Sequence, residues 1–364
     1  MPTNRNNNHF LHLDKPLLLS LVLLSFLGLV VLYSASSQDF DLMIRQIIRL
    51  LAGFVIMLGL AQINVQKIIP WVPWLYLIGI VLLILVLIIG ESSKGSQRWI
   101  NLGLFRFQPS ELMKLALPLM VAWYIAHKPV PPSYGRLLLA LIIIIIPVFL
   151  VAKEPDLGTS LLIASSGLFV LLLSGMSWRL ISGFVITSIL CLPVLWYIMH
   201  DYQRRRVLTF LNPENDPLGA GYHIIQSKIA IGSGGLYGKG WLNGTQSQLQ
   251  FLPERTTDFV FAVYSEEFGL FGVLVLLCIY FFVLTRGMYI AMRAQDTFAR
   301  LLAGSLILTF FVYIFVNIGM VIGLLPVVGL PLPLISYGGT SIVTLMAGFG
   351  LIMAVHTHRR LLGH

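Results

Sequence analysis

The chain has 364 residues, of which 57% are hydrophobic and only 11% are charged, and its formal net charge is +9. Soluble globular proteins contain about 25% charged residues, so this composition excludes a water-soluble fold and predicts a polytopic membrane protein. The strands of a membrane barrel would be shorter and would alternate apolar and polar residues. The spanning segments are therefore expected to be helices.

A helix that crosses a bilayer needs roughly 20 mostly apolar residues. Ten segments qualify, and in chain order they lie at about 16–35, 43–62, 70–90, 110–127, 137–152, 157–175, 178–200, 258–285, 299–324 and 336–356. The first apolar run is longer than the core of a signal peptide, so we expect it to remain as the first helix. The sequence predicts an all-α polytopic membrane protein with ten transmembrane helices. Residues 1–364 form one domain, with a long loop at about 201–257 between helices 7 and 8.

The orientation follows from Lys and Arg in the short loops, because short loops rich in these residues tend to stay in the cytoplasm. If the N-terminus is cytoplasmic, that side receives most of the basic residues of the short loops. The short outer loops 36–42 and 325–335 then contain no Lys or Arg. Both termini are therefore expected in the cytoplasm and the long loop outside.

Two outer stretches, 91–114 and 201–257, nevertheless carry many basic residues. One explanation is adhesion to anionic lipid headgroups; the other is an anionic ligand held at the outer face of the membrane. Within the second stretch, Tyr222, Ile225 and Ile229 recur at helical spacing and predict a short amphipathic helix. The glycine-rich run GSGGLYGKG that follows lacks the spacing of a nucleotide phosphate loop.

Charged residues lie at the start of the fourth helix, in the stretch QPSELMK. Ser110 is expected to cap this helix, because its hydroxyl can accept a hydrogen bond from an early backbone N–H. Glu111 and Lys114 are three residues apart and so can pair on one face. A structural ion pair would explain them, but charged residues in spanning helices usually face a cavity or a partner.

Two further helix starts carry acidic residues. In KEPDLGTS, Asp156 is expected in the first turn of the sixth helix, where the helix dipole favours an anion. In FLPERTTDFVFAVYSEEFGL, Thr256 or Thr257 is expected to cap the eighth helix, with Asp258 in its first turn. An intramembrane carboxylate is a functional-site hypothesis by default. The structural alternative is the helix dipole for Asp156 and helix capping for Asp258.

Glu266 and Glu267 lie two to three turns deeper in the same helix. Because they are adjacent, they must point in different directions. We expect one to pair with a basic group and the other to hydrogen-bond a neighbouring helix. The proline- and glycine-rich run GLPLPLISYGGTS, 329–341, precedes the tenth helix and predicts irregular backbone, which near a membrane is tolerated only where it is buried or lines a cavity.

One accessible carboxylate among basic residues fits an inverting glycosyl transfer. Such a reaction needs a general base to accept the proton of the attacking sugar hydroxyl. A pyrophosphate leaving group can depart without an acid where cations absorb its charge. A transporter of an anionic lipid would need a similar basic cavity, so the residues alone leave both functions open.

Several stretches, in chain order, resemble the motifs of the SEDS family (shape, elongation, division and sporulation). They are GSQRWINLG, FQPSELMKLA, KEPDLGTS, QSKIAIGSGGLYGKGWLNGTQSQLQFLPERTTDFVFAVYSEEFGL and PLPLISYGGTS. The resemblance covers nearly the whole chain and implies the SEDS fold, with a large extracytoplasmic loop. The segment GKGWLNGTQSQLQFLPER and the short termini are more similar to the elongation member of the family than to its division member.

The resemblance implies a peptidoglycan glycosyltransferase that polymerises lipid II during cell elongation and cell-shape maintenance. It would be a multi-pass protein of the bacterial cytoplasmic membrane, with both termini cytoplasmic and the active site on the periplasmic side. The expected partners are a class B penicillin-binding protein, which supplies the transpeptidase, and other membrane proteins of the elongation complex. No nucleic-acid partner is expected.

The family's functional residues map onto named positions here. The aspartate of its P-E-x-x-T-D-F pattern corresponds to Asp258, the expected catalytic base, and the acidic residue after E-P corresponds to Asp156. The Glu and Lys of the fourth helix correspond to Glu111 and Lys114. Many relatives have His-Thr before the aspartate where this chain has Thr256-Thr257, so no catalytic histidine is expected there.

The resemblance implies that Asp258 deprotonates the 4-hydroxyl of the acceptor N-acetylglucosamine, and that undecaprenyl pyrophosphate leaves. The residues expected to bind the substrate are Arg98, Glu111, Lys114, Asp156, Arg204, Arg206, Lys239, Glu254, Arg255, Thr257 and Ser336. A divalent cation, Mg²⁺ or Mn²⁺, is the cofactor that this chemistry allows, with no organic cofactor and no metal ligands assigned. The alternatives are a lipid II flippase and a non-catalytic scaffold for the penicillin-binding protein.

Overall fold

The computed structural model describes residues 13–93, 96–101, 106–199, 201–212, 220–249, 251–252 and 254–357. Long helices dominate these residues, as predicted. They are α1 (Lys15–Ala35), α2 (Phe40–Ala61), α4 (Val72–Ile89), α5 (Pro109–Ala126), α6 (Tyr134–Lys153), α7 (Leu157–Leu173), α8 (Trp178–Ile198), α12 (Val260–Met292), α13 (Thr297–Val321) and α14 (Thr340–Thr357). The shorter helices are α3 (Val65–Ile68), η1 (Ile69–Trp71), α9 (Asp201–Leu211), α10 (Ala220–Gly234) and α11 (Thr245–Gln248).

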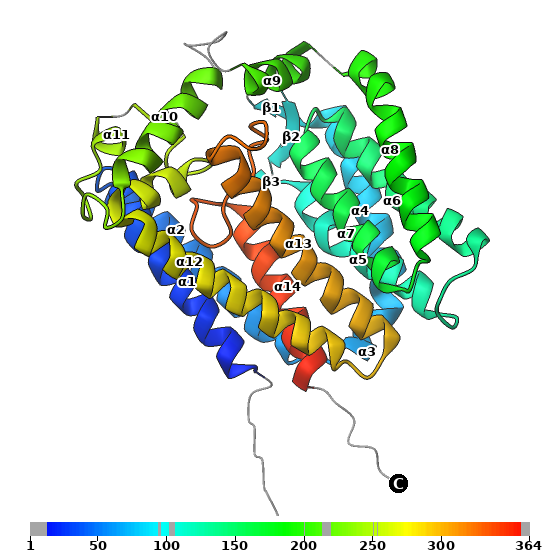
Figure 1. The fold of residues 1–364 in the computed structure, drawn as a ribbon. Coiled ribbons are helices and arrows are strands. Elements are labelled where there is room, and N and C mark those ends of the chain that lie inside the picture. The colour runs from blue at the N-terminus through cyan, green and yellow to red at the C-terminus, as the bar shows by residue number, and fades with distance from the viewer. Residues whose placement is uncertain are drawn as a thin grey trace, which may run out of the picture.

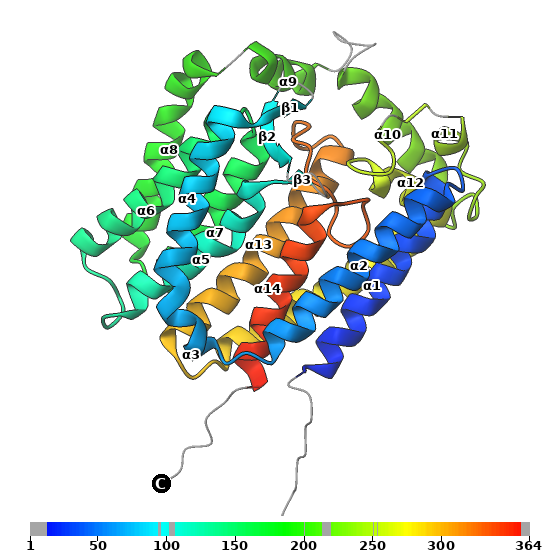
Figure 2. The ribbon, with the colours of Figure 1, turned by 180° about the vertical axis from the view of Figure 1, so that it is seen from behind.

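The long helices form one bundle, and both α1 and α14 have their chain-terminal ends at the same end of it (Figure 1). We call this the terminus end. The opposite end carries α9, α10, α11 and a small sheet, and we call it the loop end (Figures 1 and 2). Because the loop between α7 and α8 reverses the chain at the terminus end, the segment from α9 to α11 begins and ends at the loop end.

Seven of the helical segments among the described residues are long and apolar enough to cross a membrane. They are α1, α2, the continuous stretch Val65–Ile89, α6, α12, α13 and α14. Helix α7 and the stretch Trp178–Cys191 of α8 are shorter apolar helical segments, and α5 carries Glu111 and Lys114. The bundle is thus that of a membrane-integral protein, and the number of ten spans stays a prediction.

A three-stranded antiparallel sheet, which the all-α prediction did not include, lies at the loop end. Its strands are β1 (Glu91–Ser93), β2 (Ser96–Asn101) and β3 (Arg106–Phe107), and the register pairs Ser92 with Gln97 and Ile100 with Phe107. The sheet occupies the first basic stretch, between α4 and α5. It therefore fixes the backbone of Arg98 directly above the start of α5.

Helix α13 is the central helix, since it packs against α5, α7, α12 and α14. Its buried surface includes one strongly polar side chain, Asn317, in an otherwise apolar stretch. Helix α2 packs mainly on α14, whereas α4 packs on α5. The core is consequently built around α13, and the loop end of α13 lies beneath the residues that the sequence singles out.

Helix α12 is interrupted at Gly269, which has φ 63° and ψ −164°. The interruption frees backbone groups, and the segment after α10 satisfies them. The N–H groups of Lys239 and Gly240 donate to the carbonyls of Glu266 and Glu267, both at 3.0 Å, and the N–H of Leu270 donates to Gly235 O at 3.0 Å. Broken backbone at membrane depth is tolerated only where protein covers it. The glycine-rich run thus covers the break in α12.

The two adjacent glutamates have the different partners that their spacing predicts. The carboxylate of Glu266 accepts hydrogen bonds from Lys239 Nζ at 2.8 Å, Thr245 Oγ1 at 3.1 Å and Gln246 N at 3.0 Å. Glu267 accepts a hydrogen bond from the hydroxyl of Ser34 in α1. Buried charges need such partners, so this pair joins α12 to α1 and to the segment after α10.

The substitution Gly269→Ala is expected to lower the free energy of unfolding by at least about 2 kcal/mol. Its Cβ would lie 2.3 Å from Gly238 N and 2.7 Å from Leu236 O, and its φ is one that L-residues rarely adopt. The control is Gly59→Ala in α2, where a Cβ meets nothing within 4 Å. Thermal unfolding of the two purified variants checks this, and equal midpoints would contradict it.

Candidate functional site

Asp258 lies at the loop end, two residues before α12, and its side chain is half-buried. Its backbone carbonyl accepts a hydrogen bond from Asn317 Nδ2 at 3.0 Å, and the same amide donates to Leu330 O at 2.6 Å. Its carboxylate oxygen Oδ2 lies 3.5 Å from the position that a Cβ on Gly329 would occupy. Helix α13 therefore anchors the backbone of Asp258, and the segment before α14 lies beside its carboxyl group without enclosing it.

The residues before Asp258 are tied to the irregular segment 329–339. Ser336 Oγ donates to Thr257 O at 2.6 Å, and Tyr337 N donates to Thr256 O at 2.8 Å. Ser336 was expected to bind the substrate; within the described structure it is fully buried and contacts backbone. The proline- and glycine-rich run thus packs against the chain just before Asp258.

The capping predictions for two helices were wrong. Helix α12 begins at Val260, with Phe259 as its N-cap and no side-chain cap, so Asp258 precedes the first turn. Thr257 Oγ1 instead donates to Glu254 Oε2 at 2.9 Å. Helix α5 begins at Pro109 and its N-cap is Gln108, which places Ser110 inside the first turn. A proline favours the first helical position, and this preference outweighs the capping signal of the serine.

Asp156 was expected in the first turn of its helix, but α7 begins at Leu157 and Asp156 is its N-cap, whose Oδ1 accepts a hydrogen bond from Thr159 N at 3.1 Å. Its other oxygen, Oδ2, faces Arg98 Nε at 3.4 Å and Gln108 Nε2 at 3.4 Å. The guanidinium of Arg98 also donates to Pro155 O at 3.1 Å. Asp156 thus caps its helix and orients Arg98, which is about one third exposed.

Arg98 and Asp156 line a cavity at the loop end together with Arg206 from α9 and the residues Pro326, Val327 and Val328. Arg206 donates to Val327 O at 3.3 Å. The next residues of that segment, Val328 to Leu330, run between this cavity and Asp258, since Gly329 lies beside the carboxylate of Asp258. The fold therefore brings Arg98 and Arg206 to one side of this short segment and Asp258 to the other.

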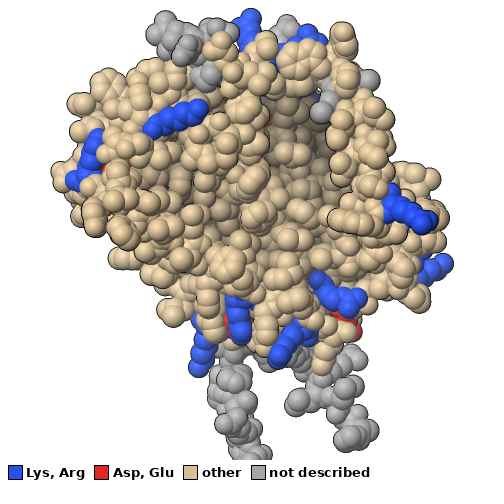
Figure 3. Space-filling model, in the orientation of Figure 1, with Lys and Arg blue, Asp and Glu red and all other residues tan. Residues whose placement is uncertain are grey.

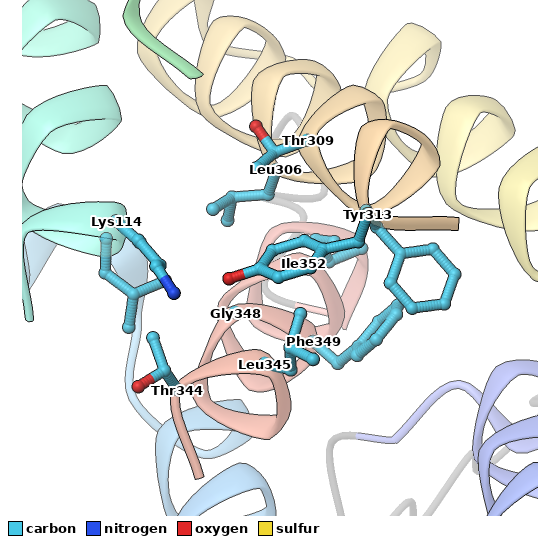
Figure 4. Close-up of a pocket in the computed structure, with 11 residues that line it drawn as sticks. Lys114, Leu306, Thr309, Tyr313, Thr344, Leu345, Gly348, Phe349 and Ile352 are labelled. Carbon is cyan, nitrogen blue, oxygen red and sulfur yellow. The ribbon is translucent and has the colours of Figure 1, made fainter. Parts of the chain in front are cut away.

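Glu111 and Lys114 form the predicted ion pair, with Lys114 Nζ 2.6 Å from Glu111 Oε1. Both side chains are buried, at 6% and 7% exposure for Lys114 and Glu111. Lys114 also lies over the ring of Tyr313, 5.3 Å from its centroid. Figure 4 shows the Lys114 nitrogen pointing toward the hydroxyl of Tyr313. The sequence analysis did not single out Tyr313, because a tyrosine in an apolar helix carries no signal of its own.

Lys114 and Tyr313 line a second cavity, between α5, α13 and α14, whose other walls are mostly apolar. Its apolar residues include Leu306, Phe349 and Ile352. This cavity and the one beside Arg98 share no lining residue. Of the cations expected to bind the substrate, Arg98 thus lies at the loop end and Lys114 lies beneath it, within the bundle.

The remaining predicted cations contact other parts of the protein. Lys239 pairs with the buried Glu266, and Arg204 donates to the carbonyls of Trp196 and Tyr197 at 2.9 and 2.7 Å. Arg255 Nη2 donates to Ser37 Oγ at 2.8 Å, and burial lowers the pKa of its guanidinium. Lys239 therefore secures the segment that covers the α12 break, rather than lying beside Asp258.

Lys and Arg side chains gather toward the two ends of the molecule, and the face between them is almost free of charge (Figure 3). The same view shows this face hollowed just below the loop end. An uncharged belt between two basic ends is the distribution expected of a protein that crosses a membrane. The hollow opens toward that belt, which would let a lipid reach the loop end from the side.

Known proteins are similar to this chain over nearly its whole length. A family model described as a cell cycle protein, covering FtsW, RodA and SpoVE, matches residues 15–361. The peptidoglycan glycosyltransferase MrdB of Escherichia coli strain K12 is 57% identical, over 100% of this chain and 99% of that protein. The probable peptidoglycan glycosyltransferase FtsW of Trichlorobacter lovleyi is 38% identical, over 94% and 92% of the two chains.

Solved structures match as well. One, from work on structural coordination of polymerization and crosslinking by a peptidoglycan synthase complex, has a TM-score of 0.84 and 31% identity, and the match covers 96% of this chain and 99% of that one. The rod shape determining protein RodA of Thermus thermophilus has a TM-score of 0.73 and 29% identity, over 95% and 98% of the two chains. The match extends over nearly the entire bundle.

Proposed function

Because the chain belongs to the FtsW, RodA and SpoVE family of cell cycle proteins, we propose that it is a peptidoglycan glycosyltransferase. Its substrate would be lipid II, polymerised into glycan strands during cell elongation. The observation that carries the proposal is a half-buried carboxyl group, Asp258, held at the loop end beside a segment whose other side lines a cavity with Arg98 and Arg206. The 57% identity to a named glycosyltransferase supports the reaction class.

In this proposal Asp258 is the general base. It accepts the proton of the acceptor's 4-hydroxyl as that oxygen attacks the anomeric carbon of the donor, and the bond from that carbon to the pyrophosphate breaks with inversion. A carboxylate that remains partly accessible can reach a sugar hydroxyl directly. The hydrogen bond from Asn317 to the Asp258 backbone carbonyl restricts the motion of Asp258, which favours a productive geometry.

The leaving pyrophosphate carries negative charge that nearby cations can stabilise. Arg98 and Arg206 are placed for this role, because both line the cavity at the loop end. Lys114 lies deeper, in a largely apolar cavity that suits the hydrocarbon part of a lipid better than its phosphates. We assign Lys114 and Glu111 to holding the base of the substrate groove, and Asp156 to orienting Arg98.

A divalent cation, Mg²⁺ or Mn²⁺, fits only in part. The described residues hold no group of three side chains of the kind that binds metals. Mg²⁺ commonly binds through one or two carboxylates and substrate phosphates, so a cation shared with the pyrophosphate is compatible with this chemistry. No step above depends on it, and no residue is assigned as a ligand.

We place the terminus end in the cytoplasm and the loop end, with the site, on the periplasmic side. The terminus end carries the exposed basic residues Lys15, Lys67, Arg293 and Arg300, which supports that orientation. A class B penicillin-binding protein is the proposed partner, because a structural neighbour belongs to a complex that couples polymerization to crosslinking. Other elongation-complex proteins are proposed on the family resemblance alone.

The test is to supply lipid II to the purified full chain, alone and with its penicillin-binding partner, and to separate the products by gel. The expected result is glycan polymer with release of undecaprenyl pyrophosphate. If lipid II instead crossed the bilayer of proteoliposomes and no polymer formed under any condition, the protein would be a flippase. If neither occurred and only complex assembly depended on it, it would be a scaffold.

A further inference from the structure

Glu154 is a buried carboxyl group that the reaction above does not use. It is the C-cap residue of α6 and directly precedes Pro155 and Asp156, and its side chain is fully buried. Neither of its carboxylate oxygens has a hydrogen-bond partner within the described part of the chain. An ionised carboxylate in such a position would be very costly, because a buried charge needs compensating partners.

The charged groups that act on Glu154 come from two neighbouring elements. Asp156 belongs to the N-terminus of α7, and Arg98 belongs to β2. Lys153 is its neighbour in sequence, but that ammonium group lies over the ring of Phe149, at 4.8 Å. Burial, followed by the charge of Asp156, raises the pKa of Glu154 to about 8, while Arg98 opposes this shift.

Arg98 remains accessible to an anion although it is held by the protein. Its guanidinium faces Asp156 Oδ2 at 3.4 Å and donates to Pro155 O, yet the side chain is about one third exposed and lines the cavity. Among the described residues, the cavity that Arg98 lines has two positive side chains, Arg98 and Arg206, and one negative side chain, Asp156. When Glu154 is neutral, these three side chains together have a net positive charge. With Glu154 ionised the charges cancel, and a second carboxylate would compete for Arg98.

We propose that Glu154 acts as a positioning residue in its protonated form, which keeps Arg98 available to bind the pyrophosphate of the lipid substrate. This inference rests on the proposed function, since it concerns the same site. Glu154 itself contacts no substrate; it sets the charge behind the arginine. Its ionisation weakens the binding of a diphosphate, and so acts on KM for lipid II more than on kcat.

The pH dependence has a definite direction. Below pH 7 most Glu154 is protonated and the site is positive; above pH 8 most of it is ionised and the site is neutral. From pH 7 to pH 9 the protonated fraction falls about tenfold for a group with a pKa near 8, and KM for lipid II is expected to rise by about the same factor. The kcat of the wild type should change far less over this range.

The test compares Glu154→Gln with the wild type, because glutamine has the shape of a protonated glutamate and cannot ionise. Initial rates of polymerisation from lipid II are measured with the full chain and its partner between pH 6 and pH 9.5. Glu154→Gln is expected to have the same KM as the wild type at pH 7 and to keep that KM up to pH 9. A variant that keeps the alkaline rise in KM, or that has a tenfold higher KM at pH 7, would overturn the inference.

A matched control and a second readout separate this inference from the proposed function. Asp41→Asn removes an exposed carboxylate at the same end of the molecule and should keep the wild-type pH profile. Binding of inorganic pyrophosphate to the same proteins is measured by equilibrium dialysis across the pH range. Absence of polymer at every pH would contradict the proposed function alone. Pyrophosphate binding with the same pH dependence in the wild type and in Glu154→Gln would overturn the role of Glu154.

Discussion

Replacing Asp258 with Asn is expected to lower kcat for glycan polymerisation by about 10²- to 10⁴-fold, the usual contribution of a general base. The amide keeps the size of the side chain but cannot accept the proton of the sugar hydroxyl. The anchors of the segment are backbone contacts through Asn317, Ser336 and Tyr337, so they should survive the change. We therefore expect KM for lipid II and the thermal unfolding midpoint to remain close to the wild-type values.

The measurement is the initial rate of polymerisation over a range of lipid II concentrations, with the purified protein and its partner. Asp41→Asn is the control, since it removes a carboxylate at the same end of the bundle, on the first turn of α2. Polymer at the wild-type rate from the folded Asp258 variant would rule out this carboxylate as the base. A variant that fails to fold is replaced by Asp258→Glu, in which the displaced carboxylate should restore part of the rate.

Removing one partner of the ion pair between Glu111 and Lys114 is expected to lower the free energy of unfolding by about 3–5 kcal/mol. Glu111→Gln leaves the ammonium group of Lys114 buried at 6% exposure without its 2.6 Å partner. The double variant Glu111→Gln, Lys114→Met removes both charges and should recover most of the lost stability, because an apolar pair of similar volume is often as stable as a buried ion pair.

Unfolding midpoints of the single and double variants in detergent check this, with Lys153→Met as the control for an exposed charge at the same end of the bundle. Lys153→Met should change the free energy of unfolding by at most about 1 kcal/mol, since it removes only an exposed charge and its contact with the Phe149 ring. The activity of the double variant is a separate readout. A stable double variant that polymerises lipid II normally would show that the pair is structural, whereas loss of activity would place Lys114 in the substrate groove.

Local sequence patterns predicted a large part of the helices and several pairs. The boundaries of α1, α7 and α8 lie within two residues of the predicted segments, because the length of an apolar run in the sequence sets the length of the spanning helix. The contact between Glu111 and Lys114 follows from helical geometry alone. The short amphipathic helix in the long loop is α10, whose bounds enclose Tyr222 and Lys228.

The errors and omissions concern positions where local signals compete or where a partner is distant in sequence. Ser110 did not cap α5, because Pro109 took the first helical position. Asn317 and Tyr313 were overlooked, since one amide or phenol in an apolar helix gives no pattern. The role of Lys239 changed from an expected substrate contact to the partner of Glu266, which lies 27 residues further along the chain.

The sequence by itself determined that this is a membrane-integral helical protein, because hydrophobicity and segment length are local properties of the chain. It also identified the family motifs and the carboxyl group of Asp258. Only the tertiary structure decided that Arg98 and Arg206 share a cavity, that Gly329 lies against Asp258 and that Glu154 is buried with no hydrogen-bond partner among the described residues. Those facts depend on contacts between residues tens to hundreds of positions apart, and packing around α13 establishes them.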